Sequence, residues 1–228
     1  MRIPVARQPA RRYETRKLPI VGTRPGLLRI DHLKVGALPP LSFSVPAGEC
    51  LAVEGPSGSG KTRILRAIAD LDPAEGYVFL DGAERCEMPA ERWRAQVRFV
   101  AAEPGWWAAT PREHMPAVPR VDRLIASLGL EAAILDRPVA ELSTGERQRL
   151  ALVRALADEP KALLLDEPTA ALDATSAALV EELIRFELLN GRRVILVSHN
   201  AAQIERLAHA RLLLGHHRAE PAQPGAAA

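Results

Sequence analysis

The sequence is poor in cysteine and contains no long apolar run. Its two cysteines, Cys50 and Cys86, are too few for a disulfide framework and indicate a reducing, cytoplasmic environment. A membrane-spanning helix needs roughly 18 consecutive apolar residues. The longest apolar runs here, such as 162–165 and 194–197, have the length of buried strands. We therefore expect neither a disulfide-rich secreted domain nor a helix that spans a bilayer.

The first 25 residues lack the apolar segment of a secretory signal. Their basic residues outnumber the single acid, Glu14, and give a charge of +6, so that with +2 for the whole chain the remainder carries −4. We predict a basic, flexible extension over residues 1–25. Contact with anionic lipid headgroups or nucleic acid, or a start codon placed too early, are the alternatives. Because the basic charge belongs to the extension, we expect no nucleic-acid partner for the folded part.

Between residues 26 and 216, short apolar runs alternate with helical patterns. With 47% hydrophobic and 25% charged residues, the 228-residue chain has the composition of a globular protein and suffices for one domain with an inserted lobe. Strands are predicted at 27–30, 41–45, 50–53, 76–80, near Phe99, 161–165, 193–198 and 210–214. Helices are predicted at 63–69, 121–128, 131–135, 146–157, 174–189 and 201–208. This alternation predicts an α/β sheet with a helical insertion at about 103–160, followed by a disordered tail at 217–228.

A glycine-rich loop stands between a predicted strand and a predicted helix. It consists of Gly55, Pro56, Ser57, Gly58, Ser59, Gly60, Lys61 and Thr62, and it matches G-x-x-x-x-G-K-[ST] at every fixed position. Glycines allow backbone N–H groups to point at phosphates, and the following helix adds its positive end. We expect Lys61 to contact the β- and γ-phosphates of a nucleotide and the Thr62 hydroxyl to ligate Mg²⁺.

A pair of acids follows the apolar strand 161–165. Asp166 and Glu167 stand at its carboxyl end, where α/β folds bind nucleotides. We expect Asp166 to hold Mg²⁺ and Glu167 to act as the general base that activates the attacking water. A strand that ends in two acids is a weak signal alone, but it becomes strong in a chain that also carries the glycine loop.

Three further segments make the resemblance to a family explicit. They are Leu142-Ser143-Thr144-Gly145-Glu146, Ala171-Leu172-Asp173, and Val197-Ser198-His199-Asn200. In this order after the glycine loop they resemble the signature motif, the D-loop and the switch histidine of the ATP-binding cassette (ABC) family. The resemblance covers roughly residues 27–215. It implies a P-loop NTPase sheet core with an N-terminal antiparallel β subdomain and an inserted α-helical subdomain.

The resemblance also implies a head-to-tail dimer that sandwiches two ATP molecules. Ser143 and Gly145 precede a predicted helix and would bind the γ-phosphate held by the other subunit, and Asp173 of the D-loop is expected among the nucleotide-binding residues. His199 would sense the γ-phosphate and orient the water. Thr144 stands where the family usually has glycine.

Two family features are missing. Ala102 occupies the position of a glutamine that touches Mg²⁺ and water, and alanine can neither ligate nor hydrogen-bond. The aromatic residue on which adenine stacks is also absent near Leu33-Lys34-Val35-Gly36, so that adenine would rest on aliphatic groups such as Val35. The three tryptophans, Trp93, Trp106 and Trp107, flank the segment of the missing glutamine and either mark an interface or pack within the helical lobe.

These observations favour the ATP-hydrolysing subunit of an ABC transporter, bound to the cytoplasmic face of a membrane. Its expected partners are a separate transmembrane permease subunit and a second ATP-binding subunit, with a homodimer favoured. The alternatives are an ABC-type ATPase outside transport, and a regulatory cassette that hydrolyses ATP slowly because of Ala102.

Overall fold

The computed structural model describes residues 11–13 and 26–215. The rest of the predicted extension 1–25 and the predicted disordered tail 217–228 lie outside the described residues. Residues Arg11–Tyr13 form β1, which pairs in parallel with β10 (Ala210–Leu213). Part of the predicted flexible extension is thus an ordered strand, a difference from the prediction. Its backbone covers the edge of β10, whose N–H and C=O groups would otherwise be unpaired.

The core is a six-stranded parallel sheet with the order β1-β10-β4-β9-β8-β7. Its inner strands are β4 (Cys50–Glu54), β9 (Arg193–Val197) and β8 (Ala162–Asp166), and β7 (Val97–Val100) forms the far edge. Every residue of β8 and β9 is buried, because layers cover both faces of a parallel sheet. The continuous apolar runs in the sequence reflect this burial.

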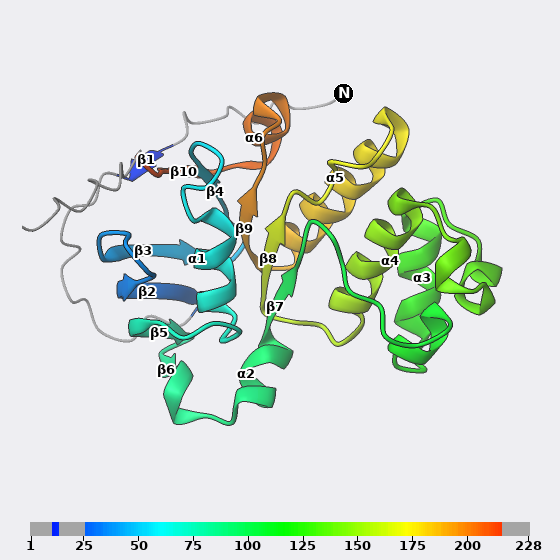
Figure 1. Cartoon of the computed structure of the whole chain (residues 1–228), viewed down its shortest axis with the longest axis horizontal. Helices are drawn as coiled ribbons and strands as arrows, with labels where there is room; N and C mark the ends of the chain where they lie inside the picture. Colours follow the sequence, from blue (N-terminus) through cyan, green and yellow to red (C-terminus); the bar gives the residue numbers. More distant parts are fainter. Residues whose placement is uncertain (1–10, 14–25, 216–228) are drawn as a thin grey trace, which may run out of the picture.

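Alternate residues of the strands face two different hydrophobic clusters. Leu164 and Ile195 pack toward α1 (Lys61–Ile68) and the antiparallel sheet, whereas Leu163 and Leu165 pack toward the helices on the other side. Figure 1 shows these two layers on opposite sides of the sheet. On the second side lie α3 (Pro119–Ser127), α4 (Thr144–Ala157) and α5 (Ala174–Leu189), and α6 (Ala201–Leu207) adds Leu207.

A four-stranded antiparallel sheet packs beside α1 in the order β3-β2-β5-β6. Its strands are β2 (Leu27–Lys34), β3 (Leu41–Pro46), β5 (Glu75–Leu80) and β6 (Ala83–Glu84). β2 runs farther than the predicted 27–30, and the register shifts on both of its neighbours around His32, which has a φ of 50°. Such a bulge breaks the two-residue alternation that the prediction relied on. The predicted fold class, with its antiparallel β subdomain, is confirmed.

The segment between β7 and β8 is mostly helical. It contains η2 (Pro111–His114), α3, η3 (Ala132–Asp136), η4 (Val139–Glu141) and α4. The predicted helix 131–135 is therefore a short 3₁₀ element. α2 (Ala90–Gln96), preceded by η1 (Arg85–Glu87), instead leads from β6 into β7. Division of the chain into subdomains at about 103 and 160 stays a prediction.

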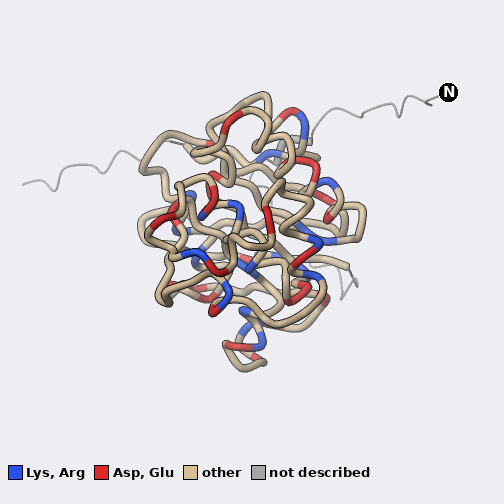
Figure 2. Tube along the Cα trace, turned by 90° about the vertical axis from the view of Figure 1, so that its right-hand side faces the viewer, with Lys and Arg blue, Asp and Glu red and all other residues tan. Residues whose placement is uncertain are grey.

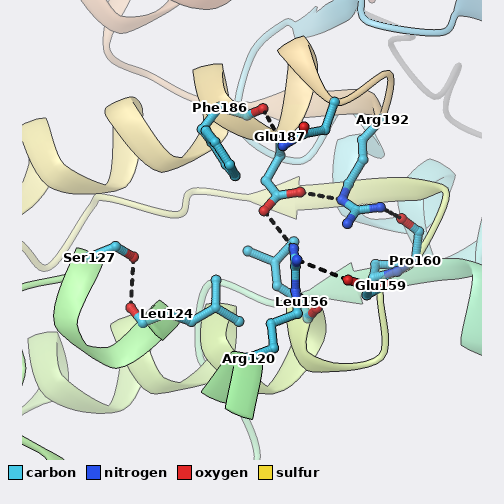
Figure 3. Close-up of polar contacts among 10 residues, drawn as sticks. Arg120, Leu124, Ser127, Leu156, Glu159, Pro160, Phe186, Glu187 and Arg192 are labelled. Carbon is cyan, nitrogen blue, oxygen red and sulfur yellow. Dashed lines mark hydrogen bonds and ion pairs between the residues drawn. The ribbon is translucent and has the colours of Figure 1, made fainter. Parts of the chain in front are cut away.

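A buried carboxylate joins the helical segment to the sheet layer. The Glu187 side chain of α5 has no exposed surface; it accepts a hydrogen bond from Arg120 of α3 at 2.8 Å and another from Arg192. Arg120 also donates to Glu159 at 3.0 Å, and Arg192 donates to the carbonyl of Pro160 at 2.6 Å. Figure 3 shows this network bridging α3, α5 and the approach to β8. Because the buried charge is shared between two guanidinium groups, its desolvation is compensated.

Candidate functional site

The glycine loop closes around its own lysine. β4 ends at Glu54 and α1 begins at Lys61, so that the loop lies at the carboxyl edge of the parallel sheet. Lys61 is 8% exposed, and its Nζ donates to the carbonyls of Gly55 at 2.8 Å and Pro56 at 2.9 Å. These bonds hold the ammonium group inside the loop, where a phosphate bound to the loop would meet it.

The backbone of the loop leaves no space for side chains at two glycines. Gly60 has a φ of 92°, and a Cβ there would lie 2.9 Å from a methyl group of Leu38. Gly55 has a φ of 155°, and a Cβ there would lie 2.9 Å from the carbonyl oxygen of Leu214. The Ser59 hydroxyl is buried and has no hydrogen-bond partner among the described residues. A cradle of backbone N–H groups with an unpaired hydroxyl fits a phosphate chain.

The two predicted Mg²⁺ ligands lie together. The Thr62 hydroxyl donates to Asp166 Oδ2 at 2.6 Å, although the residues are 104 positions apart in the sequence. β8 places Asp166 at the sheet edge with 5% exposure, directly against the first turn of α1. No group of three or more His, Cys, Asp or Glu side chains gathers in the described part of the chain. Thr62 and Asp166 would supply two protein ligands to an ion held here, and Mg²⁺ commonly combines so few with substrate phosphates and waters.

The predicted general base lies beside the predicted histidine. Glu167 Oε1 is 3.6 Å from His199 Nε2, and this oxygen is buried without a hydrogen-bond partner among the described residues. Burial raises the pKa of Glu167 above its ordinary value; Asp166 also raises it, while His199 and Lys61 oppose the shift. A carboxylate with a raised pKa and a free oxygen suits proton abstraction from water.

The backbone of Glu167 has a strained conformation that sets the direction of its carboxylate. Glu167 has a φ of 49°, a value that costs energy for a non-glycine residue. Its N–H donates to the carbonyl of Val197 at 2.9 Å, one residue beyond the last paired strand position, and this bond holds the conformation. His199 follows β9 on the neighbouring strand, so the pairing of β8 with β9 brings the two side chains together.

The signature residues stand apart from the glycine loop. Ser143 caps α4: its hydroxyl accepts from the N–H of Glu146 at 3.2 Å, and the Glu146 carboxylate accepts from the N–H of Ser143 at 2.7 Å. A Cβ at Gly145 would lie 3.1 Å from Leu172, so the start of α4 packs against the D-loop segment. None of the hydrogen bonds between described residues joins Ser143 or Gly145 to the glycine loop.

Asp173 serves as the cap of α5. Its carboxylate accepts from the N–H of Ser176 at 2.9 Å and from the Ser176 hydroxyl at 2.7 Å, and these bonds lower the pKa of Asp173. Its predicted role in nucleotide binding stays a prediction.

A cavity of about 210 Å³ continues from the glycine loop toward the antiparallel sheet. It is lined by Pro56, Ser57, Gly58, Ser59, Gly60, Arg63, Val35, Ala37, Leu38 and Gly215. Val35 is only 3% exposed and belongs to the core, so it offers little surface to a base. The hypothesis that adenine rests on Val35 is thereby weakened, because the accessible groups at this end are Ala37, Leu38 and Arg63.

The tryptophans differ in their surroundings. Trp93 is fully buried, and its Nε1 donates to the carbonyl of Ile68 at 2.9 Å, so it packs inside the core. Trp106 packs against the second cluster, with the Arg154 guanidinium 4.6 Å from its ring centre. Trp107 is 78% exposed. Of the three predicted interface candidates, Trp107 is the most exposed; its ring contacts His114 and Arg154 and otherwise faces solvent.

Comparisons with known proteins decide the family. A family model described as ABC transporter matches residues 38–170, more than half of the chain. The chain belongs to the ABC transporter family. This cassette is accordingly an ABC-type ATPase that binds ATP, and the resemblance predicted from the sequence is confirmed.

The chain is similar to individual proteins of this family over most of its length. It is 37% identical over 180 residues to protein STAR1 of Oryza sativa subsp. japonica, covering 74% of this chain and 52% of that protein. It is 36% identical over 176 residues to the cytochrome c biogenesis ATP-binding export protein CcmA of Methylococcus capsulatus, covering 72% of this chain and 84% of that one. A solved ATP-binding subunit of an ABC transporter matches with a TM-score of 0.75 and 25% identity, covering 82% and 85%. The cassette thus spans about half the length of its rice relative.

Sequence reasoning missed two residues of the site. Gln148 of α4 is 1% exposed and donates to the carbonyl of Glu167 at 2.7 Å. Arg63 lies at the cavity just after the glycine loop. A buried glutamine has no pattern of its own in a helical segment, and an arginine in a first helical turn reads as a solvated side chain. The Ser143–Glu146 capping box, in contrast, has a sequence signature that could have been read.

Proposed function

We propose that this cassette hydrolyses Mg²⁺-bound ATP and thereby drives a separate membrane-spanning subunit. The observation that carries the proposal is the meeting of four side chains at one sheet edge. The Thr62 hydroxyl lies 2.6 Å from Asp166 Oδ2. Glu167 Oε1, a buried oxygen without a hydrogen-bond partner among the described residues, lies 3.6 Å from His199 Nε2.

Each group then has a task in hydrolysis. The glycine loop and Lys61 bind the β- and γ-phosphates, and Thr62 and Asp166 hold Mg²⁺, which neutralises phosphate charge when bound. Glu167 takes a proton from the attacking water, for which its raised pKa is suited. His199 lies next to that carboxylate and orients the water and the γ-phosphate.

The proposal of a dimer rests on the signature residue Ser143, for which the cassette's own nucleotide site has no use. Ser143 sits at the N-terminus of a 14-residue helix, an anion-binding position, and none of the hydrogen bonds between described residues joins it to the glycine loop of its own chain. We propose that it binds the γ-phosphate held by a second copy, so that ATP closes a homodimer and hydrolysis opens it. This makes the γ-phosphate the switch.

A membrane partner accounts for the mechanical output. No helix in the described residues has the length and apolar character needed to cross a bilayer. CcmA is named an ATP-binding export protein, which supports transport as the role of this cassette too. We propose that the cassette lies on the cytoplasmic face of a membrane, bound to a permease subunit. Along the described part of the trace in Figure 2, Lys and Arg positions are interspersed with Asp and Glu positions.

The test uses Glu167→Gln protein, which keeps the carboxylate's shape but cannot abstract a proton. We expect it to bind ATP, to form a stable dimer with Mg²⁺, and to capture a multi-span membrane protein from detergent-solubilised membranes. The matched control is the same variant without ATP, which should remain monomeric. Capture of soluble proteins or ribosomes alone would refute the transport role and leave the ATPase intact.

A slowly hydrolysing regulatory cassette is the second candidate. It is favoured by Ala102, which lies two residues beyond β7 where the family has a water-contacting glutamine. The cellular activity of Glu167→Gln separates the two candidates: a motor loses that activity, whereas a regulator that acts by binding ATP retains it.

A further inference from the structure

The arginine after the glycine loop lies against the turn that follows β2. A Cβ placed on Gly36 would be 2.7 and 2.8 Å from the terminal nitrogens of Arg63 and 3.0 Å from its Cζ. A Cβ on Gly36 would thus be almost equally far from three atoms of the Arg63 guanidinium, so this group lies close to the Gly36 backbone. Gly36 has a φ of 58° in a turn closed by the bond from the N–H of Leu38 to the carbonyl of Val35 at 3.2 Å. The missing side chain at position 36 is what makes room for Arg63.

This guanidinium also lies at the nucleotide cavity. Arg63 lines the same cavity as the phosphate-binding loop, together with Ala37 and Leu38 from the turn. No aromatic residue lines the described cavity. The other basic residue of the turn, Lys34, forms an ion pair with Glu75 at 3.6 Å, and Val35 is buried. Among the residues that line the cavity, Arg63 therefore has the planar side chain that the base of a loop-bound nucleotide could contact.

The Arg63 head group is not engaged elsewhere in the described structure. No hydrogen bond or ion pair between described residues involves it, whereas Arg66, one turn later in α1, binds Asp72 through two bonds at 2.8 and 2.7 Å. Asp72 is thus already paired with Arg66. A planar cation that makes no hydrogen bond or ion pair with the described residues, at the edge of this cavity, is available to a ligand.

We propose that Arg63 supplies the surface on which the adenine base of the nucleotide stacks. The proposal rests on the proposed ATP-binding function and names the residue that contacts the base. A guanidinium is flat, delocalised and weakly hydrated, so it stacks on aromatic faces, which a compact ammonium group does far less well. The guanidinium lies close to Gly36 and lines the cavity beside the glycine loop, where the base would contact it.

The test compares a nucleotide with a ligand that has phosphates but no base. Binding of ADP and of tripolyphosphate, with Mg²⁺, is measured for wild-type protein, Arg63→Met and Arg63→Lys by displacement of a fluorescent nucleotide. ADP avoids both hydrolysis and ATP-driven dimer closure. We expect Arg63→Met to weaken ADP binding by about three- to thirtyfold and to leave tripolyphosphate binding unchanged. Arg63→Lys should lose nearly as much ADP affinity, because it keeps the charge and loses the plane.

Equal weakening of ADP and tripolyphosphate, with rescue by Arg63→Lys, would overturn the proposal and assign Arg63 to the phosphates. Unchanged ADP binding in Arg63→Met would overturn it as well. Arg92→Met is the matched control, since it removes an exposed helical arginine outside the cavity. Methionine and lysine are good helix formers, so both variants should fold. If the wild-type protein bound neither ligand, the proposed function itself would fail, which is a distinct outcome.

Discussion

The amide of Gln148 donates to the backbone carbonyl of Glu167 at 2.7 Å. The oxygen of the same amide accepts from the N–H of Ala171 at 3.3 Å. One buried side chain of the signature helix α4 therefore holds both the residue proposed as general base and the start of the D-loop. A displacement of α4 on binding of a second subunit would reach Glu167 through these two bonds.

Replacing Gln148 with leucine tests this connection. The variant leaves the Glu167 carbonyl and the Ala171 N–H without their partner, and we expect the free energy of unfolding to fall by about 1–3 kcal/mol. We also expect a lower kcat at unchanged ADP affinity. Urea denaturation and steady-state ATPase assays measure both effects. Gln96→Leu is the control, because the Gln96 amide donates only to the exposed carbonyl of Arg92 and to the partly buried sulfur of Met88. Wild-type stability in Gln148→Leu would show that the two bonds carry no net energy.

The raised pKa of Glu167 predicts how the ATPase rate depends on pH. Burial disfavours the charged carboxylate, so the base becomes protonated at a higher pH than the ordinary value of 4.5. The rate should therefore fall on the acid side at a pH above that of an exposed carboxyl group. A pH–rate profile measures this, and an acid limb at or below the ordinary value would contradict it.

The same shift makes a prediction for stability. A carboxyl whose pKa is higher in the folded state stabilises the fold at low pH, and this contribution is lost as the pH rises through the folded-state pKa. In Glu167→Gln no carboxyl group ionises at this position, so the stability lost by the wild type as the pH rises is retained. The Tm of the variant should therefore exceed the wild-type Tm at neutral pH and approach it in acid. Thermal unfolding without nucleotide checks this against Glu91→Gln, an exposed helical position. A Tm difference independent of pH would argue against the shift.

Thr62→Val tests the Mg²⁺ site. Valine keeps the shape of threonine but removes the hydroxyl that donates to Asp166 at 2.6 Å. We expect ADP binding without Mg²⁺ to remain, while the gain in affinity that Mg²⁺ produces falls by tenfold or more, on the order of 1.4 kcal/mol. Calorimetry with and without Mg²⁺ measures this difference. Thr62→Ser, which retains the hydroxyl, should behave like the wild type, and a full Mg²⁺ effect in Thr62→Val would remove Thr62 from the site.

Trp107→Ala tests the surface after the missing glutamine. The side chain is 78% exposed and contacts His114 edge-on, with ring centres 4.3 Å apart. We expect its removal to weaken capture of the membrane subunit by about tenfold or more, as for an aromatic anchor, and to leave the basal ATPase rate unchanged. Leu189→Ala, which is 87% exposed at the end of α5, is the control. Equal capture by both variants would exclude Trp107 from the interface.

Much of this protein was determined by the sequence alone. The glycine loop and the acids Asp166 and Glu167 could be predicted because each performs its chemistry through local backbone geometry or through the end of a single strand. The parallel sheet could be predicted because strands buried on both faces read as continuous apolar runs.

Tertiary structure decided what depends on distant segments. Only strand pairing placed Glu167 beside His199, and only the packing of α4 brought Gln148 to the Glu167 carbonyl. Val35 proved to be buried, whereas Arg63, which looked like an ordinary surface residue, lies at the cavity beside Gly36. Local periodicity carries no information on which side chain fills the space left by a glycine 27 residues away, because that depends on how the antiparallel sheet docks against α1.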